Sequence, residues 1–186
     1  PLASLEQQSN RANSGAFVGN LEVDYQIHGF EDLRLHANFG ADYSSGVQRY
    51  DNSAFGTANH YYGWSGYDLK HKYNLQFSAY AQYYKDFSET QHFDIMAGYE
   101  WQHFYNDYYN IGNGFYRDTN NDPEKRGTKY PESESSSKTE SYIVSFFGRA
   151  NYIGWNQLML TATVRADGSS RFAPEHRWGI FPSVAL

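Results

Sequence analysis

The sequence contains no cysteine among its 186 residues, so disulfide frameworks and thiolate metal sites are excluded. It also lacks any run of about 20 apolar residues, the length that a membrane-spanning helix needs, which excludes a helical membrane protein. Basic residues are few, because 15 Lys and Arg stand against 21 Asp and Glu for a net charge of -6. Nucleic-acid binding usually needs a basic face, so no nucleic-acid partner is expected.

Aromatic residues are plentiful although the chain as a whole is polar. Phe, Trp and Tyr make up 19% of the residues, whereas hydrophobic residues of every kind make up only 40% and the mean hydropathy is -0.77. Disordered chains are poor in aromatic residues, so a folded chain is expected. The chain begins at Pro1 without the pattern of a signal peptide, which predicts a processed chain or an internal fragment.

Apolar and polar residues alternate along most of the chain, and this period of two is typical of a β-strand with one apolar face. In one such segment, Leu21, Val23 and Tyr25 alternate with Glu22 and Asp24. The pattern predicts an all-β, antiparallel fold of about seven strands, at residues 17–28, 33–43, 69–84, 92–102, 141–152, 158–167 and 177–186. The alternation holds for about 11 to 16 residues in most of them, whereas strands of ordinary soluble domains usually have about 5 to 6.

The connections between the predicted strands alternate between short and long. Residues 28–32, 85–89 and 153–156 are predicted to form tight turns, and residues 44–66 and 104–138 to form long loops. Compact soluble domains rarely keep such long loops, but bacterial transmembrane barrels have short periplasmic turns and long extracellular loops. The sequence therefore predicts an antiparallel transmembrane β-barrel segment with its long loops outside the cell.

The two sets of alternating side chains would face lipid and lumen. Leu21, Val23, Leu75, Phe77 and Ile95 are among the apolar residues predicted to face lipid. Aromatic residues end the apolar stripes where a bilayer interface would fall, at Tyr25, Tyr43, Tyr73, Tyr83, Tyr99, Trp101, Tyr142 and Tyr152. The polar residues predicted to face the lumen are Asn20, Glu22, Asp24, Arg34, His36, Asn38, Lys70, Lys72, Asp94, Glu100 and Arg149. Charged residues on this face are expected to pair with one another or to line water.

A soluble antiparallel sheet with one wet face would show the same alternation, so this alternative stays open. Such a sheet would be a soluble binding module, for example for glycans, with exposed aromatic residues as stacking platforms. Six complete strands cannot close a membrane barrel, for which about eight are the minimum. Residues 1–186 are therefore expected to form part of a single, larger barrel domain, and this part could not transport by itself.

No pattern in the sequence predicts an enzyme or a bound cofactor. Asp118, Asn120 and Asp122 have the spacing of a calcium loop, but Pro123 and Lys129 stand where an EF-hand needs Gly and Glu. These three residues are therefore a weak metal candidate, and a solvated turn is the favoured interpretation. The seven His residues form no cluster with metal-ligand spacing.

A dense group of arginine, serine and glycine residues joins the last two predicted strands. The first of these strands is expected to end at Asp167 and Gly168, because Gly adopts a turn conformation at low cost. The charged, small and aromatic residues around this turn are Arg165, Asp167, Gly168, Ser169, Ser170, Arg171, Arg177 and Trp178. We interpret them as a structural network at the barrel rim in preference to a substrate-contacting site. Pro182 lacks an N–H, so the last strand is expected to bulge at Phe181 and Pro182.

Two stretches resemble the SusC/RagA family of TonB-dependent outer-membrane transporters. The more specific one is Arg165-Ala-Asp-Gly-Ser-Ser-Arg-Phe172, followed by Arg177-Trp-Gly-Ile-Phe-Pro-Ser183, which is similar to a signature late in that family's barrel. The other is Pro1-Leu-Ala-Ser-Leu-Glu6 with Phe17-x-Gly-Asn-Leu21 after it. The resemblance covers both ends of the chain, and the large loops between them match no pattern of the family.

The resemblance implies a barrel of about 22 strands with an internal plug and an N-terminal segment that engages TonB. Neither the plug nor the coupling segment is expected within residues 1–186. It further implies residence in the outer membrane of a Gram-negative cell, in contact with its lipid, and a SusD-like surface lipoprotein as partner. The implied activity is uptake of a nutrient, either an oligosaccharide or a peptide, at the expense of the inner-membrane proton gradient. A passive porin wall, which has no plug, is a further alternative.

Overall fold

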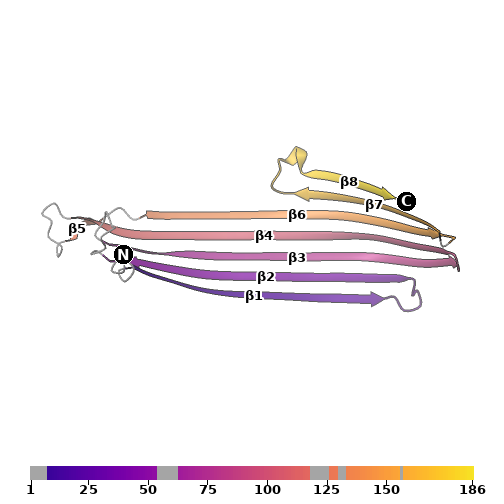
Figure 1. Cartoon of the computed structure of the whole chain (residues 1–186), viewed down its shortest axis with the longest axis horizontal. Coiled ribbons are helices and arrows are strands. Elements are labelled where there is room, and N and C mark those ends of the chain that lie inside the picture. The colour runs from indigo at the N-terminus through magenta and orange to yellow at the C-terminus, as the bar shows by residue number, and fades with distance from the viewer. Residues whose placement is uncertain (1–7, 54–62, 118–125, 130–132, 156) are drawn as a thin grey trace. The chain divides into compact units, whose positions relative to one another are not determined.

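The computed structural model describes residues 8–53, 63–117, 126–129, 133–155 and 157–186. These residues form eight strands: β1 (Gln8–Gln26), β2 (Leu33–Asn52), β3 (Trp64–Ser88), β4 (Gln91–Arg117), β5 (Arg126–Lys129), β6 (Ser133–Gly154), β7 (Leu158–Ser169) and β8 (Trp178–Ala185). A short 3-10 helix, η1 (Pro174–His176), precedes β8. The strands lie side by side in the order β1-β2-β3-β4-β6-β7-β8, and β5 pairs with β4 (Figure 1). The predicted all-β, antiparallel fold is confirmed. In the described part of the chain, no helix has the length and apolar character needed to cross a membrane.

The chain divides into two compact units, and most of the long strands contribute residues to both. We call the first the loop unit, because it holds the connections from β2 to β3 and from β4 to β6. It comprises Pro1–Phe17, Tyr43–Tyr73 and Tyr105–Thr139. The second, the turn unit, holds the tight connections between strands and comprises Val18–Asp42, Asn74–Phe104 and Glu140–Leu186.

Several strands are longer than the sequence predicts. β2 continues to Asn52, so much of the predicted 44–66 loop is strand. β4 continues to Arg117 and β6 begins at Ser133, so the predicted extent of the 104–138 loop is also wrong. The Gly, Ser and Asn residues of these extensions are typical of loops. Pairing of each strand with its neighbours overrides that local tendency, as is common for β-structure.

Strand β8 pairs with β7 in an unbroken register that places Pro182 opposite Val164. The bulge expected at this proline and the residue before it is therefore wrong. The Ser169 N–H donates to the Arg177 carbonyl at 3.0 Å, and hydrogen-bonded pairs alternate along the ladder from that point. By this alternation the Val164–Pro182 pair exchanges no hydrogen bonds, so the proline nitrogen points away from β7. Pro182 consequently removes nothing from this ladder.

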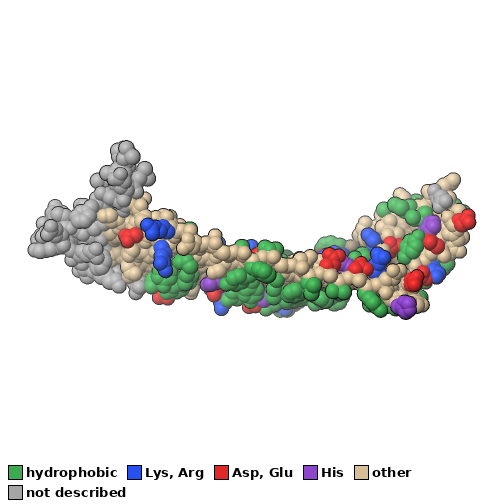
Figure 2. Space-filling model, turned by 90° about the horizontal axis from the view of Figure 1, so that it is seen from below, with side chains coloured by type: hydrophobic (Ala, Val, Ile, Leu, Met, Phe, Trp, Pro, Cys, Tyr) green, Lys and Arg blue, Asp and Glu red, His purple; other side chains and the backbone are tan. Residues whose placement is uncertain are grey.

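The apolar face of the turn unit is exposed. On β1, Leu21 is 65% exposed and Val23 is 52% exposed. On β7, Leu160 and Val164 are exposed, whereas the polar side chains that alternate with them are half-buried. Hydrophobic side chains accordingly form continuous patches at the surface (Figure 2). A soluble fold buries such a face because burial supplies its main stabilisation. A sheet with this distribution is suited to an apolar surrounding.

Candidate functional site

The hairpin of β1 and β2 carries a cluster of charged side chains on its polar face. The Arg34 Nε lies 3.4 Å from the Asp24 Oδ1 across the two strands. The His36 ring lies 3.7 Å from the Glu22 Oε1 and 3.6 Å from the Asp24 Oδ2. The structure thus brings together four of the residues predicted to face the lumen. Period two had placed them on one face, and the hairpin pairing makes them neighbours.

The same polar face continues across β3 and β4. The His36 ring stacks on Tyr80 with 4.6 Å between ring centroids. The Asn74 amide donates to the Asp42 carboxylate at 3.0 Å, and the Gln82 amide donates to the Asp94 carboxylate at 3.0 Å. These two bonds link β2 with β3 and β3 with β4 through polar side chains.

Other members of the predicted lumen-facing set are less engaged. Asn20 lines a groove of about 380 Å³ on strands β1 to β4. One carboxylate oxygen of Asp94 and the Nε of Arg149 are buried without a hydrogen-bond partner in the described part of the chain. Lys70 and Lys72 are exposed in the loop unit. The facing of all these residues toward a lumen stays a prediction, as it does for Asn38.

Arg165 is the centre of a polar network that joins three strands of the turn unit. Its Nε donates to the Asp167 Oδ1 at 2.7 Å. Its Nη2 donates to the Glu100 Oε2 at 3.0 Å and to the Ser145 Oγ at 3.1 Å. The register of β6 and β7 pairs Ser145 with Asp167 and Phe147 with Arg165, so the side chains meet on one face. The guanidinium thereby ties three strands together with the fixed fork of donors that only arginine has.

The sequence did not predict the contacts of Arg165 with Glu100 and Ser145. Glu100 was assigned to the lumen-facing set and Arg165 to the rim network, and the structure joins the two sets. Ser145 is 1% exposed and was not singled out. The alternation along β6 predicts which face of the sheet Ser145 lies on, but no feature of the sequence predicts its contact with Arg165.

The remaining residues of the predicted rim network bond mainly to the backbone. The Ser170 hydroxyl accepts from the Tyr142 N–H at 2.8 Å, and the Ser169 hydroxyl accepts from the Arg171 N–H at 3.3 Å. The Arg177 Nε donates to the Phe172 carbonyl at 3.2 Å. The predicted rim network is therefore divided into two groups. One contains Arg165 and Asp167, and the other contains Arg177 and the turn before it. Such bonds hold a turn in shape, and they support the structural interpretation of the network.

Gly168 lets Trp178 lie across β7. A Cβ added at Gly168 would come within 2.9 Å of the Trp178 ring, so any larger residue would displace the indole. Trp178 stacks on Phe146 at 6.1 Å, Phe146 contacts Tyr99 at 5.4 Å, and Tyr99 contacts Phe77 at 6.4 Å. These four rings form a row on the exposed apolar face. Interfacial aromatic rows of this kind occur in transmembrane barrels.

Charged pairs also join neighbouring strands at the tight turns. The Lys85 ammonium contacts the Asp32 carboxylate, and this hydrogen bond raises the pKa of Lys85. The His92 ring bonds the Asp86 carboxylate, and that bond lowers the pKa of Asp86. Both contacts lie beside the β3–β4 turn and favour the charged forms of the lysine and the carboxyl group.

His103 shows a feature that sequence reasoning missed. It is 7% exposed, stacks on Tyr142 with 4.3 Å between ring centroids, and its Nε2 lies 2.9 Å from the Glu140 Oε1. This histidine packs among aromatic rings with an acidic partner, which is a structural role.

A metal centre is not formed by the residues that the structure describes. Among them, no group of three or more His, Asp or Glu side chains could hold an ion. The weak metal candidate at Asp118, Asn120 and Asp122 lies outside the described residues.

Sequence comparison connects the chain with known receptors. No family model matches it. It is 43% identical over all 186 residues to the TonB-dependent receptor SusC of Bacteroides thetaiotaomicron, and it covers 18% of that protein. A match to the TonB-dependent receptor P3 of Formosa agariphila is 42% identical over 52 residues, which is 28% of this chain and 5% of the relative. The chain therefore spans less than a fifth of the length of these curated relatives.

Solved structures show the same fold. The RagAB peptide importer in its closed-closed state superposes with a TM-score of 0.82 and 19% identity, over 96% of this chain and 20% of that chain. The structure of the RagAB peptide transporter gives a TM-score of 0.81 and 21% identity over the same shares.

The fold is thus that of a barrel segment of TonB-dependent transporters, with about seven long strands. As such a segment, the chain is similar over its whole length to SusC, a member of the SusC/RagA family of TonB-dependent receptors. The predicted resemblance to this family is confirmed. Its relatives are receptors and importers and not enzymes, which also agrees with the sequence prediction.

Proposed function

We propose that this chain forms part of the wall of a TonB-dependent outer-membrane transporter that imports a nutrient. The identity of 43% to SusC across the whole chain carries the proposal. The exposed apolar face of the turn unit supports it, since soluble monomers rarely expose large apolar patches. The row of aromatic rings that ends at Trp178 would lie at the membrane interface.

The opposite face would line the lumen. Its charged residues pair across strands, as Asp24 does with Arg34 and Glu100 with Arg165. Paired charges keep a wall wettable while leaving no isolated ion, so a polar solute can pass along it. The facing of this set of residues is part of the proposal.

The substrate would be an oligosaccharide or a peptide. RagAB, which is a peptide importer, is a precedent for the peptide. We also propose a SusD-like surface lipoprotein as the partner and TonB as the source of energy. TonB would deliver the energy of the inner-membrane proton gradient through a part of the transporter outside residues 1–186.

Uptake by cells tests this function. The complete transporter is expected in the outer-membrane fraction, and deletion of its gene should abolish uptake of one labelled oligosaccharide or peptide from a panel. Removal of TonB should abolish the same uptake. Uptake that persists without TonB would instead indicate a passive porin. Recovery of the protein without detergent in the soluble fraction would indicate a soluble glycan-binding module.

A further inference from the structure

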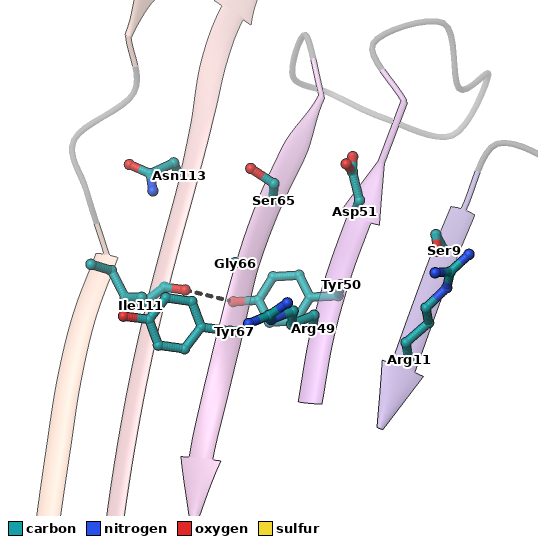
Figure 3. Close-up of a pocket in the computed structure, with 10 residues that line it drawn as sticks. All are labelled: Ser9, Arg11, Arg49, Tyr50, Asp51, Ser65, Gly66, Tyr67, Ile111 and Asn113. Atoms are coloured by element: carbon teal, nitrogen blue, oxygen red, sulfur yellow. Dashed lines mark hydrogen bonds between the residues drawn. The ribbon is translucent and has the colours of Figure 1, made fainter. Parts of the chain in front are cut away.

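A pocket of about 500 Å³ lies in the loop unit, on strands β1 to β4 (Figure 3). β1 contributes Arg11, β2 contributes Arg49 and Asp51, and β3 contributes Tyr67. Neither arginine forms a side-chain hydrogen bond or an ion pair within the described residues, although Asp51 lines the same pocket. The pocket therefore holds two positive charges with no partner in the described chain.

The two arginines lie opposite each other on neighbouring strands. A Cβ added at Gly46 would lie 3.8 Å from the Ser14 Cβ, which shows that these two residues are cross-strand neighbours. β1 and β2 form an antiparallel hairpin, so three residues further along the pair becomes Arg49 and Arg11. Like charges directly opposite each other destabilise a strand pair. An anion bound between them would remove that cost.

Arg11 and Arg49 share a face with a row of aromatic residues. Period two puts Arg11 on the same face of β1 as Phe17, and Arg49 on the same face of β2 as Tyr43. Phe17 is 65% exposed and Tyr43 is 46% exposed. This is the face that the proposed function turns toward lipid, so the pocket would open outward and away from the lumen.

The spacing along the strands sets the depth of the pocket. Phe17 is six positions along β1 from Arg11, and Tyr43 is six positions along β2 from Arg49. At about 3.3 Å per residue this is about 20 Å along a strand, or about 15 Å along the membrane normal for strands tilted by about 40°. The interfacial zone of a bilayer adds only about 5 to 7 Å on each side. The arginines would lie beyond the acyl chains, at the depth of the sugars of a glycolipid.

We propose that this pocket binds the phosphorylated saccharide headgroup of a glycolipid in the outer leaflet. Arginine is suited to phosphate because its planar fork makes two parallel charge-assisted hydrogen bonds. Tyr67, which is 37% exposed and lies 6.2 Å from the Tyr109 ring, offers an aromatic surface to a sugar beside the phosphate. The proposal rests on the proposed function, because only an outer-membrane wall presents this face to that lipid.

The test measures glycolipid binding to the complete transporter. The protein is placed in nanodiscs of phosphatidylcholine that contain fluorescent lipopolysaccharide, or the same lipid after removal of its phosphates. The double variant Arg11→Gln with Arg49→Gln is compared with the wild type. We expect its affinity for the phosphorylated lipid to be about ten- to a hundredfold weaker, since two charge-assisted contacts are lost. Removal of the phosphates should weaken wild-type binding to a similar extent.

A matched control removes the same charge from the other face. Period two puts Lys70 and Lys72 opposite the Tyr67 face of β3, and both are exposed. The double variant Lys70→Gln with Lys72→Gln should bind the lipid within about twofold of wild type if the arginines act as a site and not as general charge. An equal loss in both double variants would overturn the proposal.

Three further outcomes decide the source of the ligand. Equal binding of phosphorylated and dephosphorylated lipid by the wild type overturns the proposal. Inorganic phosphate that binds as tightly as the lipid points to a free anion and also overturns it. The wild type could instead self-associate independently of lipid, and the double variant Arg11→Gln with Arg49→Gln could abolish this self-association. That outcome would assign the face to a second copy of the chain and overturn the proposal. Outer-membrane recovery and TonB-dependent uptake are measured alongside, so a failure of the proposed function is recognised separately.

Discussion

At the scale of single residues, Arg165 connects three strands of the turn unit. It bonds Asp167 on its own strand, Glu100 on β4 and Ser145 on β6. Removal of the guanidinium would leave the Glu100 carboxylate, whose side chain is 16% exposed, without this partner. Removing one partner of an ion pair lowers the free energy of unfolding by more than the intact pair adds to it, because the remaining charge stays partly buried without a partner.

The variant Arg165→Met should therefore lower the free energy of unfolding by about 1 to 3 kcal/mol. Arg171→Met removes the same charge at an exposed position of the turn and should change it by less than about 0.5 kcal/mol. Urea unfolding of the complete transporter in lipid vesicles measures both. Equal destabilisation by the two substitutions would show that the Arg165 network does not hold the strands together.

Glycine at position 168 provides a second test at this scale. Gly168→Ala would place a Cβ 2.9 Å from the Trp178 ring, whereas Gly148→Ala would meet its nearest neighbours at 3.7 and 3.8 Å. We expect the first to lower the free energy of unfolding by about 1 to 3 kcal/mol, and the second to have little effect. The emission of Trp178 should also shift in Gly168→Ala as the indole moves. An unchanged spectrum and equal stability of the two variants would contradict the close packing.

At the scale of strands, the alternation of β7 defines two faces with different surroundings. Val164 is 50% exposed on the apolar face, and Thr163 points to the other side. If the apolar face contacts lipid, Val164→Arg should cost about 2 to 4 kcal/mol, because a cation would be placed near the bilayer midplane. Thr163→Arg should cost much less. The measurement is folding into lipid vesicles against urea, and equal tolerance at the two sites would argue against lipid on the Val164 face.

The period-two pattern explains how much of the fold the sequence could predict. Alternation is a local property, so the strands around Leu21 or Val164 and their apolar faces were recognisable. The strand ends were not, because the extensions of β2 and β4 are rich in Gly, Asn and Ser. Whether such a segment is strand depends on a paired neighbour, which a single sequence does not show. The effect of Pro182 on the β7–β8 ladder was also not predictable, because it depends on which residue pairs of the ladder exchange hydrogen bonds.

The candidate site was predictable to a similar degree. Asp24 and Arg34 flank one tight turn, so their pairing follows from the hairpin. Glu100 and Arg165 are far apart in the sequence, and only the order of β4, β6 and β7 brings them together. The arginine signature around Gly168 identified the family, but its separation into two groups depends on side-chain positions that no motif encodes.

At the scale of the whole molecule, the β1–β2, β3–β4 and β6–β7 connections lie at one end of the strands and are short, whereas the β2–β3 and β4–β6 connections of the loop unit are longer. In transmembrane barrels the short turns are periplasmic and the long loops extracellular. Glu31, in the β1–β2 turn, and Glu134, at the start of β6, are both exposed and carry the same charge. They are a matched pair for testing sidedness, because this chain contains no cysteine.

The single variant Glu134→Cys should react with a membrane-impermeant maleimide on intact cells, in a transporter otherwise free of cysteine. Glu31→Cys should react only after the outer membrane is permeabilised, because its turn would lie in the periplasm. Labelling is read as a mass shift of the purified protein, and full reaction of both variants in detergent shows that both thiols are accessible. The reverse order of labelling would invert the topology, with the arginine pocket of the loop unit then on the periplasmic side and out of reach of outer-leaflet glycolipid.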